Sequence, residues 1–151
     1  MSQSAIVALA TPTGRSGIGI IRLSGGESIG ITQKLVDDAE FLPTPRNAHL
    51  KQLHDPTTGE VIEEAIITYF QAPNSFTGED VVEISCHGSP VLLRQVVDIC
   101  LSLGARMADA GEFTLRALGN GRINLAEAEA IRDLIDAQTT ASARQAVRQL
   151  R

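Results

Sequence analysis

The sequence predicts an α/β (α+β) domain with a mixed sheet of about five strands and three or more helices. Short apolar or alternating runs bounded by Gly, Pro, Asn and Asp are typical of strands. Between and after them lie segments with apolar residues at helical spacing and cap residues at their ends. The 151 residues are 43% hydrophobic but only 3% aromatic, which indicates one domain of ordinary size with an aliphatic core.

The first half of the chain is expected to supply four strands. Ala5–Ala10 and Ile18–Leu23 are apolar runs on either side of a turn-rich loop, so we expect them to form a hairpin. Ala48–Leu53 and Ala65–Phe70 are expected to pair across Asp55–Gly59, where Pro and Gly stand in favoured turn positions.

The fifth strand, Asp80–Cys86, follows a turn that contains Gly78. Because side chains alternate along a strand, one face should carry Val82, Ile84 and Cys86 and the other Val81, Glu83 and Ser85. A carboxylate in an otherwise apolar strand is unusual. Glu83 must face solvent or find a partner that is cationic or rich in N–H groups.

The first helix is predicted from a capping box. Ser24 and Glu27 have its spacing, a hydroxyl followed three residues later by a carboxylate. The helix should run to about Val36. Its buried side is expected to hold Ile29, Thr32, Leu35 and Val36.

The clearest helix is predicted over Pro90–Leu103. Ser89 is its expected N-cap, and proline is favoured at the first helical position. Gly104 should end it in the left-handed conformation. The apolar stripe comprises Leu93, Val96, Val97 and Cys100.

Two further helices follow. A capping box at Asp109 and Glu112 predicts a short helix to Leu118, and Gly119–Gly121 then breaks the chain. Asn124 and Glu127 predict the start of a longer one, whose stripe is Leu125, Ala128, Ile131, Leu134 and Ile135. Its pattern reaches residue 151 without a C-cap, so we expect a domain over residues 1–120 and the truncated start of a helical domain over 121–151.

Several classes of protein are disfavoured. The net charge of −5 argues against a nucleic-acid-coating protein. No signal peptide and no apolar run of about 18 residues is present, so we expect a cytoplasmic chain outside the membrane. The histidines and the two cysteines lack metal-ligand spacing, and no GxxxxGK[ST] nucleotide motif occurs. Cys86 and His87 should point to opposite faces, which excludes a nucleophile–base pair.

Three charges remain in unusual places. Arg22 and Glu83 lie inside predicted strands, and Arg122 lies in a glycine-flanked loop before a helix. If they converge, they form a pocket for a ligand with an amidine-like N–H edge and anionic groups, such as a pterin or purine with a glutamate tail or phosphate. The alternative is that Glu83 pairs with an arginine. Spacing alone leaves both open.

Three long segments carry a resemblance: IVALATPTGRSGIGIIRLSG, APNSFTGEDVVEISCHGSPVLL and GARMADAGEFTLRALGNGRINLAEAEAIRDLIDA. They resemble the N-terminal domain of the bacterial tRNA modification GTPases called TrmE or MnmE, over nearly the whole chain. The resemblance implies a fold like the folate-binding module of the glycine-cleavage T-protein. It also implies a homodimer and a pocket for a 5-formyl-tetrahydrofolate-type one-carbon carrier near the dimer interface.

In that family the chain continues into a helical domain with an inserted GTPase domain. GTP, Mg²⁺ and K⁺ would bind only there. With a flavin-dependent partner protein, such a parent helps to install a carboxymethylaminomethyl-type group on the wobble uridine of tRNA. The 151 residues alone are therefore expected neither to hydrolyse GTP nor to modify tRNA.

Matched by motif, the family's folate contacts fall on Arg22 in IIRLSG, Glu83 in VVEI and Arg122 in GNGRINL. The third position is usually lysine in the family. Ser89 replaces a glycine, Ala110 a proline and Asn124 an aspartate. Two alternatives stay open: a purely structural dimerisation module with a vestigial pocket, and a folate-dependent aminomethyltransferase-like enzyme.

Overall fold

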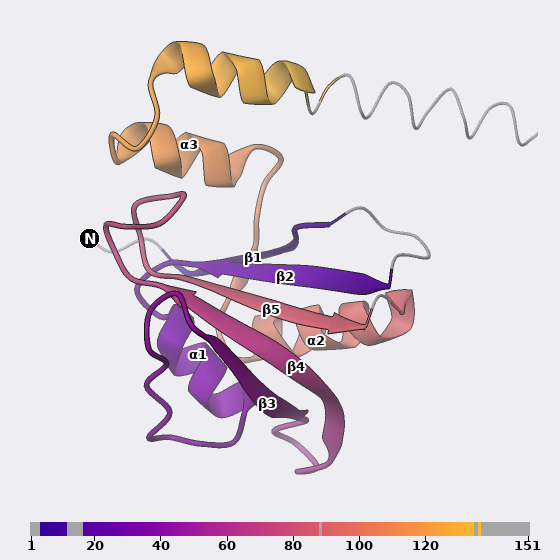
Figure 1. The fold of residues 1–151 in the computed structure, drawn as a ribbon. Coiled ribbons are helices and arrows are strands. Elements are labelled where there is room, and N and C mark those ends of the chain that lie inside the picture. The colour runs from indigo at the N-terminus through magenta and orange to yellow at the C-terminus, as the bar shows by residue number, and fades with distance from the viewer. Residues whose placement is uncertain (1–3, 12–16, 88, 135, 137–151) are drawn as a thin grey trace, which may run out of the picture.

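The structure, a computed structural model, describes residues 4–11, 17–87, 89–134 and 136. Strands and helices follow one another along it much as the sequence predicts (Figure 1). In chain order the elements are β1 (Ile6–Leu9), β2 (Ile18–Ser24), α1 (Ser28–Leu35), β3 (Ala48–His54), β4 (Val61–Phe70), β5 (Val81–His87), α2 (Pro90–Ser102), β6 (Arg106–Met107) and α3 (Glu112–Gly119). A further helix over residues 125–134 comes after α3.

The strands form one sheet in the order β3-β4-β5-β2-β1-β6. All neighbours are antiparallel except β1 and β6, so the predicted mixed sheet is confirmed, with six strands instead of about five. The predicted pairings of β1 with β2 and of β3 with β4 are both present. The sequence does not predict β6 because its two residues are exposed and form no pattern. Pairing with Ile6 and Val7 makes them a strand.

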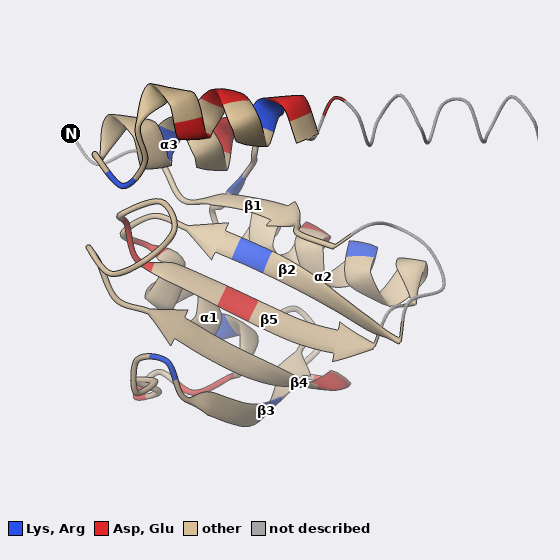
Figure 2. Ribbon diagram, turned by 45° about the horizontal axis from the view of Figure 1, so that its top comes forward, with Lys and Arg blue, Asp and Glu red and all other residues tan. Residues whose placement is uncertain are grey.

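The sheet has a covered face and an open face. Helices α1 and α2 pack on the covered face, behind the sheet in the view of Figure 2. Val82, Ile84 and Cys86 are buried on this face, as predicted. Arg22 and Glu83 have the opposite parity along β2 and β5, so they lie on the other side, which we call the open face. The core therefore lies between the sheet and two helices.

The core is aliphatic, as the composition predicts. Its largest fully buried side chains come mostly from the strands. Each Val, Leu or Ile among them contributes about 1.5–3 kcal/mol by leaving water. They are Ile6, Ile21, Leu23, Leu35, Leu53, Ile67, Ile84, Val7, Val81, Val82, Val96 and Thr32.

The predicted helix stripes are right at most positions. Ile31 of α1 is buried, whereas the predicted Ile29 is only partly so. In α2, Ile99 joins the predicted Leu93, Val96 and Cys100, and Val97 is partly buried. Apolar residues at neighbouring positions leave a helix more than one face to bury, and packing on the sheet selects among them.

The predicted capping box at Ser24 and Glu27 is wrong. Ser24 ends β2, and α1 begins after Glu27 without a side-chain cap hydrogen bond. The Ser24 hydroxyl instead lies 2.7 Å from Thr77 Oγ1 and donates to Glu79 Oε1 at 2.8 Å. Partners more than fifty residues away have displaced the local cap.

The other helix ends agree better. Ser89 Oγ accepts from the Leu92 N–H at 3.4 Å, and Gly104 has a φ of +113°, as predicted. Asn124 and Glu127 cap each other's backbone N–H, with distances of 3.2 and 2.8 Å, which confirms this capping box.

The box at Asp109 and Glu112 is half formed. The Glu112 carboxylate accepts from the Asp109 N–H at 2.9 Å. The residue at the N-cap of α3 is Gly111, which provides no side-chain hydrogen bond. Its φ of +76° is the left-handed conformation that favours glycine.

Helix 125–134 lies next to α3, on the side of the molecule beyond β1 (Figure 1). Leu125 and Leu134 of the predicted stripe are exposed, and Ala128 and Ile131 are partly buried. Ile135 and the predicted continuation to residue 151 lie outside the described residues. The boundary at residues 120 and 121 stays a prediction.

Candidate functional site

Arg22 and Glu83 lie directly opposite each other on neighbouring strands, β2 and β5. In Figure 2 the blue band on β2 and the red band on β5 mark their positions on neighbouring strands. Arg22 Nε and Nη2 donate to Glu83 Oε2 at 2.9 and 2.7 Å. The two predicted residues therefore converge, and Glu83 pairs with Arg22. We call Arg22 and Glu83 the open pair.

The open pair has further binding capacity. Its side chains remain 29% and 22% exposed. Both hydrogen bonds end on Oε2, and within the described residues Oε1 of Glu83 accepts none. A carboxylate can accept about four hydrogen bonds, so Glu83 can meet a second N–H donor. Oε1 is thus one atom at which the pair can accept a further hydrogen bond.

Phe113 of α3 covers the arginine of the pair. The Arg22 guanidinium carbon lies 5.7 Å from the centre of the Phe113 ring, a cation–π arrangement. The ring is only partly buried. The open pair is thus bordered on one side by an aromatic ring, which suits a planar ligand.

Arg122, the third predicted residue, is held elsewhere. It lies in the loop after α3, and its Nε donates to the Ser75 carbonyl at 3.0 Å. Among the described residues no hydrogen bond or ion pair joins it to Arg22 or Glu83. The structure brings two of the three predicted residues into contact and places the third against the loop of residues 75–80.

Gly78 allows this loop to pack against the end of α3. Its φ is +82°, and a Cβ at this position would lie 2.9 Å from Asn120 Cβ and 3.1 Å from Arg122 Cγ. The prediction that Gly78 adopts angles other residues avoid is confirmed. Only glycine fits this approach without a shift of its neighbours.

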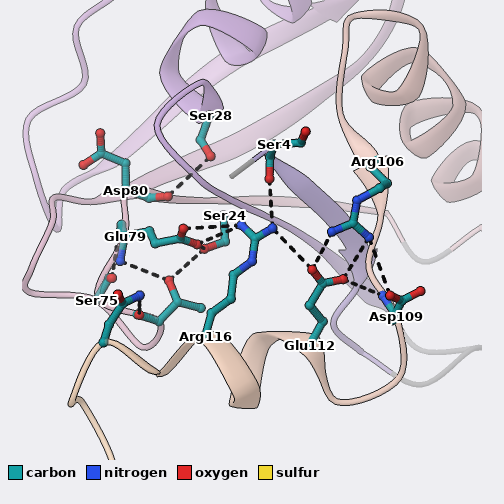
Figure 3. Close-up of polar contacts among 12 residues, drawn as sticks. Ser4, Ser24, Ser28, Ser75, Glu79, Asp80, Arg106, Asp109, Glu112 and Arg116 are labelled. Carbon is teal, nitrogen blue, oxygen red and sulfur yellow. Dashed lines mark hydrogen bonds and ion pairs between the residues drawn. The ribbon is translucent and has the colours of Figure 1, made fainter. Parts of the chain in front are cut away.

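A second arginine–glutamate pair was not singled out from the sequence. Arg116 of α3 is buried, with 5% of its side chain exposed, and its Nη1 donates to Glu79 Oε1 at 3.0 Å. Its Nη2 donates to the Ser4 carbonyl at 3.0 Å and to Glu112 Oε2 at 3.3 Å (Figure 3). We call Arg116 and Glu79 the closed pair. The helical spacing of Glu112 and Arg116 was the one available signal.

Glu112 is the most perturbed carboxylate in this region. Hydrogen bonds from Arg106 lower its pKa to about 2, with help from the Asp109 N–H and from Arg116, while burial acts in the opposite direction. It therefore stays ionised and holds two arginines at the start of α3. Figure 3 shows it between Arg106 and Arg116.

The turn after β5 carries no catalytic pair. Cys86 is buried and His87 is exposed, so they face opposite ways, as predicted. Burial raises the pKa of the Cys86 thiol to about 11, which makes it a poor nucleophile. His87 Nδ1 lies 2.9 Å from Glu63 Oε2, and this contact lowers the pKa of Glu63. Ser89 has φ −60° and ψ 120°, angles that serine adopts without strain.

A groove elsewhere on the described part of the chain is separate from the three candidate residues. An open groove of about 570 Å³ runs between α2 and the turn after β3, and none of the three candidates lines it. Among the described residues no three His, Cys, Asp or Glu side chains are placed to hold a metal ion. No helix in this part of the chain is long and apolar enough to cross a membrane.

Comparison with known proteins identifies relatives of the chain. The family described as GTP-binding protein TrmE N-terminus matches residues 5–122. A tRNA modification GTPase MnmE from Koribacter versatilis is 50% identical over 147 residues, which are 96% of this chain and 32% of the relative. The protein of that name from Xanthomonas euvesicatoria is 52% identical over 149 residues, 99% of this chain and 32% of the relative.

The similarity extends to more distant bacteria. The tRNA modification GTPase MnmE of Flavobacterium johnsoniae is 43% identical over 153 aligned positions, which cover all of this chain and 33% of the relative. The chain thus spans about a third of the length of these relatives. The match covers β1 to α3 and includes all three predicted site residues. The chain belongs to the TrmE N-terminus family.

Proposed function

We propose that this chain is the N-terminal part of a tRNA modification GTPase and that it binds a 5-formyl-tetrahydrofolate-type one-carbon carrier at the open pair. The observation that carries the proposal is Glu83 Oε1, an acceptor at a partly exposed ion pair with no donor from the described residues. The N–H edge of a pterin ring matches this oxygen. The carboxylates of a folate tail match the arginines.

Each of four residues has a separate role in this proposal. Glu83 accepts hydrogen bonds from the ring, Arg22 orients the carboxylate, and Phe113 borders the plane of the ring. Arg122 supplies positive charge for the anionic tail from the loop after α3. When bound, the carrier would supply the one-carbon unit, and the protein residues hold it.

The wider role is proposed from the relatives. The parent would use its GTPase domain, with Mg²⁺ and K⁺, and a flavin-dependent partner protein to help install a carboxymethylaminomethyl-type group on the wobble uridine of tRNA. This chain would contribute carrier binding and homodimerisation in the cytoplasm.

The exposed apolar residues of the open face support dimerisation. Leu50 and Ile66 face each other across β3 and β4 and are 63% and 42% exposed. A second copy is a suitable cover for such a patch. They also favour the second candidate function, a structural dimerisation module in which Arg22 and Glu83 merely satisfy each other.

Calorimetry of the 151-residue chain with 5-formyltetrahydrofolate separates these functions. We expect saturable binding, and Glu83→Gln should weaken it about 10–100-fold, since a hydrogen bond to a charged group is worth about 1.5–3 kcal/mol. Glu64→Gln is the matched control, because Glu64 is an exposed carboxylate on β4 of the same sheet. Equal affinity of Glu83→Gln and the unaltered chain would remove the assigned role.

Sedimentation equilibrium tests the second candidate. The structural module would be favoured if the dissociation constant of the dimer is the same with and without 5-formyltetrahydrofolate and if calorimetry detects no heat when this compound is added. A chain that stays monomeric at all accessible concentrations would contradict dimerisation through this part of the protein.

A further inference from the structure

We propose that Arg116 is a positioning residue for the carrier site: through Glu79 it fixes the loop of residues 75–80, which anchors Arg122 relative to the open pair. This inference rests on the proposed function. It assigns a role to a buried ion pair that contacts neither Arg22 nor Glu83 by any hydrogen bond among the described residues.

The closed pair joins three separate parts of the chain. Arg116 lies on α3, Glu79 precedes β5, and the Ser4 carbonyl precedes β1. Its two terminal nitrogens make all of its hydrogen bonds, because Nε is buried and has no partner within the described residues. The two Nη atoms of the guanidinium thus join α3 to the segments that precede β5 and β1.

Glu79 passes this constraint to the strand that carries Arg22. Its Oε1 accepts from Ser24 Oγ at 2.8 Å, and its backbone N–H donates to Thr77 Oγ1 at 3.2 Å. Ser24 and Arg22 are two residues apart on β2 and therefore lie on the same face of the sheet. The closed pair thus contacts β2 at Ser24, two residues from Arg22 of the open pair.

The same loop then holds Arg122. The Ser75 carbonyl accepts from Arg122 Nε at 3.0 Å, and the Thr77 carbonyl accepts from Asn120 Nδ2 at 2.8 Å. A Cβ on Gly78 would lie 2.9 Å from Asn120 Cβ and 3.1 Å from Arg122 Cγ, so the loop approaches both residues closely. The loop is thus fixed to β2 and α3 by the closed pair, and Arg122 is fixed to the loop.

If Arg116 had only a structural role, its loss would affect stability and binding affinity differently. Loss of the closed pair would then lower stability and leave the affinity of the folded fraction unchanged. If Arg116 acts through Arg122, its loss must weaken binding only while Arg122 is present. Non-additivity of two substitutions detects such an indirect path.

The experiment is a double-mutant cycle read by calorimetry with 5-formyltetrahydrofolate, at a temperature where circular dichroism shows each chain folded. We expect Arg116→Met to weaken binding about 10-fold in the unaltered chain and less than about 2-fold in the Arg122→Ala background. Arg116→Lys should restore part of the affinity. Arg106→Gln is the matched control, since Arg106 shares Glu112 but does not contact Glu79, and it should bind as the unaltered chain does.

Hydrogen exchange provides a readout that needs no ligand. Arg116→Met should speed exchange of the amides at 75–80 and 119–122 by more than the loss of global stability requires, whereas the amides of β2 and β5 should speed up only by that global amount. If Arg116→Met does not fold, Glu79→Gln tests the same link, because it removes the charge and keeps an acceptor for Ser24. Unchanged affinity, or an equal loss in both backgrounds, overturns the inference. Failure of the unaltered chain to bind overturns the proposed function first, before any variant is measured.

Discussion

The open and closed pairs have the same chemistry and different surroundings. Each joins an arginine to a glutamate at the beginning of β5, where Glu79 precedes the strand and Glu83 is its third residue. The two glutamates are similarly exposed, 22% for Glu83 and 19% for Glu79, and the difference lies in the arginines, 29% for Arg22 and 5% for Arg116. Arg116 also binds Glu112 and Ser4, while Arg22 is held by Glu83 and a ring.

This difference separates a residue pair that can exchange partners from one that cannot. An exposed ion pair contributes only about 0–1 kcal/mol, so a ligand can share or replace one partner at little cost. Removing one partner of a buried pair leaves a charge without water or counter-charge, which costs about 3–5 kcal/mol. Burial of the arginine, more than residue type, therefore distinguishes the pair at which we propose a ligand from the pair that holds the fold.

The largest expected effect comes from breaking the closed pair. Arg116→Met should lower the free energy of unfolding by about 3–5 kcal/mol, because Glu79 and Glu112 lose a buried counter-charge. Urea denaturation followed by circular dichroism measures it. A loss below about 1 kcal/mol would place the closed pair in the same class as the open pair.

A smaller loss is expected from disturbing the loop that the closed pair holds. Gly78→Ala should cost about 1–3 kcal/mol, since the new Cβ meets Asn120 and Arg122 at a backbone angle that alanine avoids. Gly30→Ala in α1 is the control, because it has open space and should be neutral or stabilising by up to about 1 kcal/mol. Similar effects of both substitutions would mean that the contact at Gly78 has no consequence.

The free energy of unfolding should fall at low pH because Glu112, which holds Arg116, becomes protonated there. The pKa of Glu112 is about 2 when folded and 4.5 as its ordinary value, so its contribution is complete above pH 4.5 and lost as the pH falls toward 2. We expect on the order of 1–2 kcal/mol, reduced by solvent at the half-exposed Arg106. Urea denaturation of Glu112→Gln between pH 5 and pH 2 should show a flatter profile than the unaltered chain. An identical slope would contradict the shift.

The smallest effect is expected at the open pair. Arg22→Met should change the free energy of unfolding by less than about 1 kcal/mol, and added salt should reduce the difference because the pair is partly exposed. The same urea titration at low and high NaCl measures it. A loss comparable to that of Arg116→Met would show that the open pair is a structural element.

Local patterns in the sequence were sufficient for much of the fold. Alternation along β5 separated Glu83 from Val82, Ile84 and Cys86. The reciprocal cap of Asn124 and Glu127 involves residues three apart, so spacing reveals it directly. The capping box at Ser24 failed because Thr77 and Glu79 compete for the hydroxyl.

The candidate site divides in the same way. The sequence marked Arg22, Glu83 and Arg122 as charges in unusual places, and the resemblance to one family assigned them a shared ligand. It did not mark Arg116, because an arginine four residues after a glutamate is usual on a solvated helix face. Only the docking of α3 on the loop before β5 made that arginine a buried one.

The sequence by itself determined the order of the elements apart from β6, the apolar face of β5 and the family. The elements follow from patterns that repeat within about one to four residues, and the family follows from three long matching segments. Tertiary structure decided which acid each arginine meets, since Arg22 and Glu83 are separated by 61 residues and Arg116 and Glu79 by 37. Strand register set the first pairing and helix packing set the second. Burial then left Arg22 and Glu83 partly exposed to solvent and enclosed Arg116 within the fold.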